Sequence, residues 1–144
     1  MAPVCGPFGP LGRLNQHIHP ESMHTAYEGH APLARFCGRV ALAQYEKGLH
    51  FIQEQPHPSL LYQETPWPHV LSLPNVVQTI YHRCMMGLRV QHGECKGYDL
   101  KKPSSTTASC PELTYYFEGK ICSQQRDHIP VTGALGKKRY LLKC

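Results

Sequence analysis

The first twelve residues, Met1-Ala-Pro-Val-Cys-Gly-Pro-Phe-Gly-Pro-Leu-Gly12, decide how the rest of the chain is interpreted. Pro3, Pro7 and Pro10 each remove a backbone donor and fix φ, so no helix is expected in this stretch. The glycines between them let the backbone come close to another group. A stiff loop of this kind presents the thiol of Cys5 either in a tight structural turn or beside a flat ligand. A proline- and glycine-rich terminus without fixed structure accounts for the composition equally well.

The composition is that of a globular chain of one domain's size. Its 144 residues include 41% hydrophobic and 17% charged residues, which is enough for a modest core. The formal net charge is +5 and favours polyanionic partners only mildly. The sequence has no apolar run of membrane-spanning length and no secretion signal. We therefore expect an intracellular protein, cytoplasmic or nuclear, without a membrane partner.

Seven cysteines are present, and their spacing is wide and irregular. No Cys-x-x-Cys pair occurs, so neither a zinc ribbon nor a thioredoxin motif is expected. A zinc site is an open alternative for five residues of the second half of the chain: Cys84, Cys95, Cys110, Cys122 and His128. Because their spacing does not support a tetrahedral set and buried free cysteines are common, no metal is expected.

The first regular element expected is a helix over residues 32–47. Residues of its expected buried face recur at helical spacing: Leu33, Phe36, Cys37, Val40, Ala41, Gln44 and Tyr45. Pro32 suits the first turn and Gly48 the position just past the end, so Cys37 is expected in the core. The preceding residues 13–30 are polar and contain four histidines, and we expect a long exposed loop there.

A short buried strand is expected over residues 49–56, because Leu49, Phe51 and Ile52 are apolar and suited to a sheet. Pro56 ends this strand, since proline cannot donate to a ladder, and Glu54 therefore lies at its C-terminal end. Later elements are expected to be a strand over 76–84, an extended segment or loop over 99–110 and a short helix over 111–117.

These elements predict an α/β protein with a partial Rossmann-like three-layer fold and a short, mainly parallel sheet. A helix followed by a short apolar strand is the second half of a βαβ unit. The first strand of that unit is reduced to residues 1–3, so an upstream polypeptide segment is an expected partner. Residues 1–100 are expected to form this unit. Residues 101–144 are expected to form an irregular segment that contains cysteine and histidine and ends in a basic tail.

Two stretches resemble motifs of cytosine-5 DNA methyltransferases. Ala2-Pro-Val-Cys-Gly-Pro-Phe8 is similar to their Pro-Pro-Cys loop, and His50-Phe-Ile-Gln-Glu-Gln-Pro56 is similar to the strand that ends in a glutamate. A closer resemblance, to a segment of retroelement polyproteins, covers almost the whole chain. Its further motifs appear here in the same order: Cys84-Met-Met-Gly87, Lys101-Lys-Pro-Ser104, Cys122 and His128 followed by Gly133.

The chain departs from these patterns at several positions. Val4 replaces the second proline of the loop, Gln55-Pro56 replaces an Asn-Val pair, and Ser104 replaces a threonine. Arg126 stands where the retroelement pattern often has a histidine. The glycine-rich half that binds S-adenosylmethionine would lie upstream of Met1. We therefore expect no cofactor in this chain and a module that is truncated and, without a methyl donor, inactive as a methyltransferase alone.

The resemblance implies a covalent mechanism. A thiolate, here that of Cys5, attacks C6 of cytosine, and a carboxylic acid, here that of Glu54, shares a proton with N3. The base must leave its stack to reach both groups. Five basic residues are expected to contact phosphates of DNA or RNA: Lys101, Lys102, Lys137, Lys138 and Arg139. The competing interpretation is a non-catalytic module that binds nucleic acid or another part of a polyprotein.

Overall fold

A computed structural model of the chain describes residues 1–93, 95–123 and 128–130. The α-helices are α1 (Gly12–Ile18), α2 (Pro20–Glu46) and α3 (Trp67–Ser72). The strands are β1 (Ile52–Pro56), β2 (Val77–His82), β3 (Asp99–Lys101), β4 (Pro103–Ala108) and β5 (His128–Pro130). Short 3-10 turns are η1 (Gly6–Phe8), η2 (Leu60–Gln63), η3 (Arg83–Met86), η4 (Pro111–Leu113) and η5 (Tyr115–Phe117). Among the described helices, none is long and apolar enough to cross a membrane.

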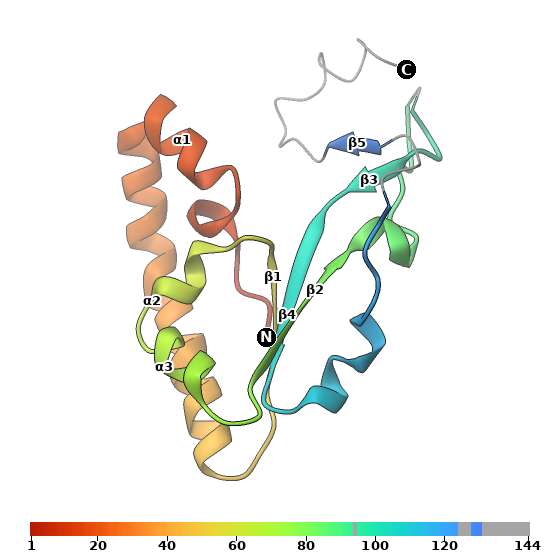
Figure 1. Cartoon of the computed structure of the whole chain (residues 1–144). Coiled ribbons are helices and arrows are strands. Elements are labelled where there is room, and N and C mark those ends of the chain that lie inside the picture. The colour runs from red at the N-terminus through yellow and green to blue at the C-terminus, as the bar shows by residue number, and fades with distance from the viewer. Residues whose placement is uncertain (94, 124–127, 131–144) are drawn as a thin grey trace.

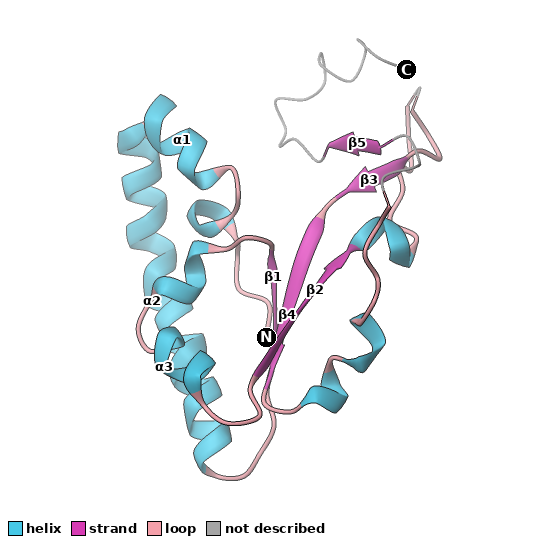
Figure 2. Ribbon diagram, in the orientation of Figure 1, coloured by secondary structure: helices cyan, strands magenta, loops and turns pink. Residues whose placement is uncertain are grey.

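The main sheet has three strands in the order β1-β4-β2, and β4 is antiparallel to both neighbours. The helices pack on one side of this sheet, and η4 and η5 lie on the other (Figures 1 and 2). A second, two-stranded sheet pairs β3 with β5 in parallel. The expected mixture of helix and sheet is confirmed, whereas the expected mainly parallel main sheet is wrong. Because β4 is its middle strand, the boundary expected at residue 100 falls within a hydrogen-bonded unit.

The middle strand β4 has an unusual sequence for its position. Its four central residues are at most 1% exposed, although all are polar: Ser104, Ser105, Thr106 and Thr107. A central strand is normally apolar on the faces that it buries. This Ser/Thr run therefore does not predict a central strand. For this reason the expected parallel sheet did not include residues 103–108.

Helix α2 begins at Pro20, a full twelve residues before the expected start at Pro32, so the loop predicted over 13–30 is wrong. Pro32 lies inside the helix, where a proline costs about 3 kcal/mol. Tertiary contacts hold the extra turns in place. The hydroxyl of Tyr27 donates to Glu64 Oε1 at 2.6 Å, and its ring packs edge-on against Phe8 with centroids 5.8 Å apart.

The buried face of α2 consists of small residues: Ala31, Ala34, Cys37, Gly38 and Ala41. Trp67 packs on this face fully buried, and its indole N–H donates to the carbonyl of Ala34 at 2.9 Å. A Cβ at Gly38 would lie 3.1 Å from Trp67 Nε1, so the glycine permits this close approach. The prediction of Cys37 in the core is confirmed. The expected burial of Leu33 and Phe36 is wrong, since both are exposed.

Candidate functional site

The segment that precedes Cys5 lies beside the strand that carries Glu54. The Met1 amino group donates to the carbonyl of Ile52, and the Glu54 amide donates to the carbonyl of Met1 at 3.0 Å. In parallel pairing, the amide and the carbonyl of one residue bond to two residues of the neighbouring strand that are two positions apart. Met1 bonds Ile52 and Glu54 in this way. The chain thus runs from an extended segment through the Cys5 loop and helix α2 into β1, in the expected order. The expected place of Glu54 at the C-terminal end of the strand is wrong, because it is the middle residue of β1.

Cys5 is exposed and begins a tight turn. Its carbonyl accepts bonds from the amides of Phe8 and Gly9, both at 2.8 Å, which closes η1. The Gln55 side chain donates to the carbonyl of Pro3 at 3.1 Å. Two residues of chain span at most about 7 Å, so the Cys5 backbone stays close to the end of β1.

Glu54 is paired with an arginine that the sequence alone did not single out. Its carboxylate forms an ion pair with Arg83 Nη2, with the two side chains 28% and 31% exposed. Arg83 follows directly after β2, and its Nε donates to Ser104 Oγ at 3.0 Å. In the sequence, the indication of this partner is a basic residue at the end of a predicted strand. The sequence does not give the order of the strands, so it does not pair Arg83 with Glu54.

The glycine-rich turn does not offer a cradle for S-adenosylmethionine. A Cβ at Gly12 would lie 2.1 Å from the carbonyl oxygen of Pro7. The space beside Gly12 is thus filled by the turn's own backbone, and Phe8 between them is buried. The backbone beside Gly12 is therefore not open to this cofactor.

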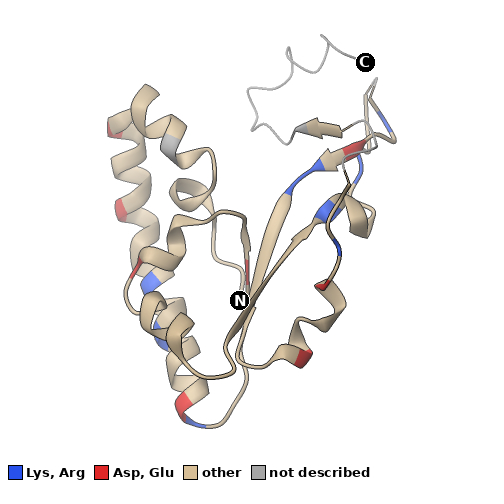
Figure 3. Cartoon of the chain, viewed as in Figure 1, with Lys and Arg blue, Asp and Glu red and all other residues tan. Residues whose placement is uncertain are grey.

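Basic residues gather where the two sheets meet (Figure 3). Lys101 ends β3, and the adjoining Lys102 leads into β4. Nearby, Arg89 donates to Asp99 at 3.1 Å. Two aromatic residues on the far side of the sheet, Tyr115 and Tyr116, are 75% and 69% exposed. The other expected phosphate contacts, Lys137, Lys138 and Arg139, lie outside the described residues.

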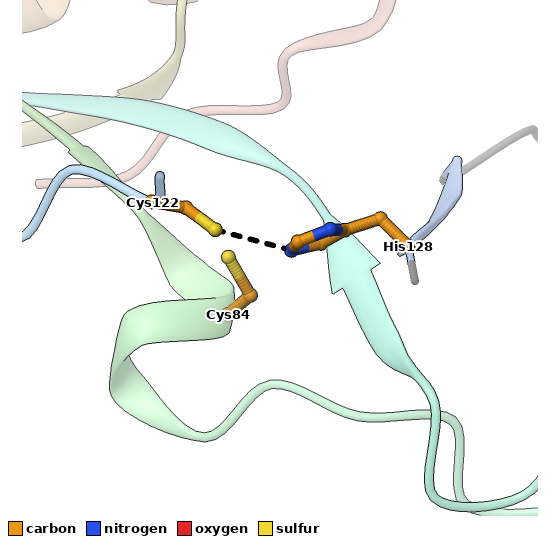
Figure 4. A group of neighbouring side chains, drawn as sticks. All are labelled: Cys84, Cys122 and His128. Atoms are coloured by element: carbon orange, nitrogen blue, oxygen red, sulfur yellow. Dashed lines mark hydrogen bonds between the residues drawn. The ribbon is translucent and has the colours of Figure 1, made fainter. Parts of the chain in front are cut away.

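A separate group brings together residues that the sequence left unassigned. Cys84 in η3, Cys122 after η5 and His128 in β5 each offer one ligand atom, and these atoms all lie within 4.8 Å of one another (Figure 4). Cys122 Sγ lies 3.4 Å from His128 Nε2. Both cysteines are buried. Burial raises the pKa of the Cys84 thiol, and contact with Cys122 raises it further.

The described part of the chain thus contains two chemically distinct groups. One is the ion pair of Glu54 and Arg83 on the main sheet, whose strand β1 also pairs with the segment that leads to Cys5. The other joins Cys84, Cys122 and His128 beside the small sheet. No known protein family, curated protein or solved structure matches the chain. Function is therefore assigned from the chemistry of these side chains.

Proposed function

We propose that the chain is a cytosine-5 methyltransferase-like nucleic-acid module of the kind found in retroelement polyproteins. Cys5 is its nucleophile and Glu54 its acid. The pairing of Met1 with β1 supports this proposal, because the segment that leads to Cys5 runs beside the strand that carries Glu54. Cys5 is exposed, as a nucleophile that meets a macromolecule must be.

The Rossmann-like relationship belongs to the same proposal. β1 and β2 each pair antiparallel with β4, so they run in the same direction as each other. Met1 also pairs in parallel with β1, and α2 connects the two segments. Parallel α/β sheets often carry an antiparallel strand at one edge, whereas here the reversed strand β4 lies in the middle.

The chemistry assigned to the site needs two groups and no methyl donor. The thiolate of Cys5 forms a bond to C6 of a cytosine, and the electron pair of the C5–C6 double bond moves to C5 and the ring. A proton shared with N3 by Glu54 stabilises the adduct. C5 then takes a proton from water. Loss of a C5 proton re-forms the double bond and expels the thiolate. Methyl transfer itself would need S-adenosylmethionine held by a further segment.

The second candidate is a nucleic-acid-binding module without catalysis. It is favoured by the exposed Lys101 and the half-buried Lys102, which can contact phosphates, and by the exposed rings of Tyr115 and Tyr116. Exposed aromatic rings can stack successive bases of a single strand. This candidate requires no reactive thiol at Cys5.

Protection of Cys5 from alkylation tests where a nucleic acid binds. The folded chain is treated with iodoacetamide with and without a cytosine-containing single-stranded oligonucleotide, and modified cysteines are located by mass spectrometry. The half-buried Cys110 is an internal control in the same molecule. The proposal expects slower alkylation of Cys5 and an unchanged rate at Cys110. Binding that leaves both rates unchanged contradicts the proposed site and favours the second candidate.

A further inference from the structure

The group Cys84, Cys122 and His128 is assembled from three separate parts of the chain. Cys84 belongs to the turn after β2, Cys122 to the segment after η5, and His128 to the first position of β5. Side chains from distant segments that converge on one point are what a metal ligand set requires. Chance neighbours along one element would not show this convergence.

The donor set and its spacing fit zinc. Two thiols and one imidazole are ligands that zinc prefers in structural sites. With Zn–S near 2.3 Å and Zn–N near 2.0–2.1 Å, tetrahedral geometry separates S and N by about 3.6 Å. The observed distance from Cys122 Sγ to His128 Nε2 is 3.4 Å. All three ligand atoms lie within 4.8 Å of one another, so a small inward movement completes the geometry.

Neighbouring groups hold the ligands in place. The amide of Cys122 donates to His82 Nδ1 at 3.0 Å, which ties the ligand's backbone to the end of β2. The His82 amide in turn donates to the carbonyl of Lys120 at 2.8 Å. A small cavity between these segments is lined by His82, the three ligands, and two lysines: Lys101 and Lys102. Second-layer contacts of this kind orient the ligands of metal sites.

An ion at this position would stabilise the second sheet. Its strands β3 and β5 have three residues each, and an isolated two-stranded pair is marginal in water. An ion held by Cys84 on the main-sheet side and His128 on β5 would join the two sheets directly. Small structural units that lack a large core commonly depend on such a cross-link.

We propose that Cys84, Cys122 and His128 bind one zinc ion that fastens the two-stranded sheet to the end of β2. Three described ligands leave one tetrahedral position for a further donor. The two thiols release their protons when the ion binds, so two thiolate charges balance the charge of the ion. This inference does not depend on the proposed chemistry of Cys5.

The test measures zinc in the full chain, purified under reducing conditions, and follows cobalt substitution by absorption spectroscopy. We expect about one zinc per chain and, after exchange, a thiolate-to-cobalt charge-transfer band. Cys84→Ser and His128→Gln should weaken zinc binding by more than the roughly 10–100-fold expected for loss of a supporting residue. Cys110→Ser removes a thiol outside the group and should retain both zinc and the band.

The wild-type chain decides the outcome if a ligand variant does not fold. Absence of zinc and of the cobalt band in a chain that melts cooperatively overturns the proposal. So does a disulfide between Cys84 and Cys122 that persists under these conditions, located by peptide mapping. Zinc retained equally by Cys84→Ser and Cys110→Ser also overturns it.

Discussion

Arg83 reaches across β4 to pair with Glu54, so the end of β2 and the strand β1 are joined by an ion pair as well as by the sheet. The same guanidinium donates to Ser104 on the strand between them. Three strands therefore contribute to one polar contact. In the proposed site this contact fixes the carboxyl group of Glu54 near the segment that leads to Cys5.

The first prediction concerns the strength of this ion pair. Because both side chains are about a third exposed, solvent screening limits the coupling between Arg83 and Glu54 to about 1 kcal/mol or less. A double-mutant cycle with Arg83→Met and Glu54→Gln, measured by urea unfolding, gives this coupling. A value near 3 kcal/mol or above, typical of fully buried pairs, would contradict the described exposure.

A second prediction uses two glycines of the same helix. In Gly38→Ala the new Cβ would meet Pro66 Cδ at 2.7 Å, and overpacking of this kind costs about 1–3 kcal/mol. In Gly29→Ala nothing lies within 4 Å, so the higher helix propensity of alanine should stabilise the chain by up to about 1 kcal/mol. Thermal or urea unfolding should move in opposite directions for the two variants. Movement in the same direction would show that α2 and α3 do not pack as described.

A third prediction is a pH dependence of stability. Burial raises the pKa of Tyr62, although hydrogen bonds with neighbours such as Thr107 lower it in part. An unfolded tyrosine ionises near pH 10, whereas folded Tyr62 keeps its proton at that pH. The unfolded state then binds fewer protons, so the free energy of unfolding contributed by Tyr62 is lost as the pH rises above about 10.

Urea unfolding of Tyr62→Phe at alkaline pH tests the predicted loss of unfolding free energy. The variant should be less stable at pH 7, because Thr107 Oγ1 loses the hydroxyl to which it donates, and its stability should fall less steeply above pH 10. Tyr115→Phe removes an exposed hydroxyl and should keep the wild-type slope. Equal slopes in the wild type and Tyr62→Phe would contradict the burial of this hydroxyl.

A fourth prediction addresses nucleic-acid contacts. Replacing Lys101 and Lys102 by alanine should weaken binding of a single-stranded oligonucleotide, and should reduce the salt slope by roughly 0.7 for each lost phosphate contact. Lys47→Ala, at the exposed end of α2, is the matched control. Fluorescence anisotropy over a range of salt concentrations measures both quantities. If the control changes the slope as much as the double variant, these lysines are not a specific contact.

The sequence predicts those elements that are specified by residues adjacent in the chain, and it misses those that depend on distant contacts. The strand that carries Glu54 was predicted over 49–56 and is present as Ile52–Pro56, ending at the expected proline. The expected burial of Leu49 and Ile52 is wrong, because both are exposed and the buried side chains of β1 are those of Gln53 and Gln55. The start of α2 was missed, since Pro32 is a strong local stop signal and its cost is offset by the distant contact of Tyr27 with Glu64. The polar strand β4 was missed because its burial comes from neighbours that only the fold supplies.

The same distinction holds for the candidate sites. Cys5 and Glu54 were proposed from motifs that are each continuous in the sequence. Cys84, Cys122 and His128 were considered for zinc but not assigned, because ligands from three separate segments have no regular spacing. Arg83 could be recognised only after β4 was found between β1 and β2.

Exchange of the C5 hydrogen of cytosine with solvent tests the central claim most directly, because it requires thiolate addition but no methyl donor. A cytosine-containing oligonucleotide is incubated with residues 1–144 in deuterium oxide, and deuterium at C5 is followed by NMR. The account predicts exchange with the wild type and with Cys110→Ser, none above background with Cys5→Ser, and a rate about 10²–10⁴-fold lower with Glu54→Gln. A rate that is the same for the wild type, for Cys5→Ser and for no protein would contradict the assignment of Cys5 as a nucleophile.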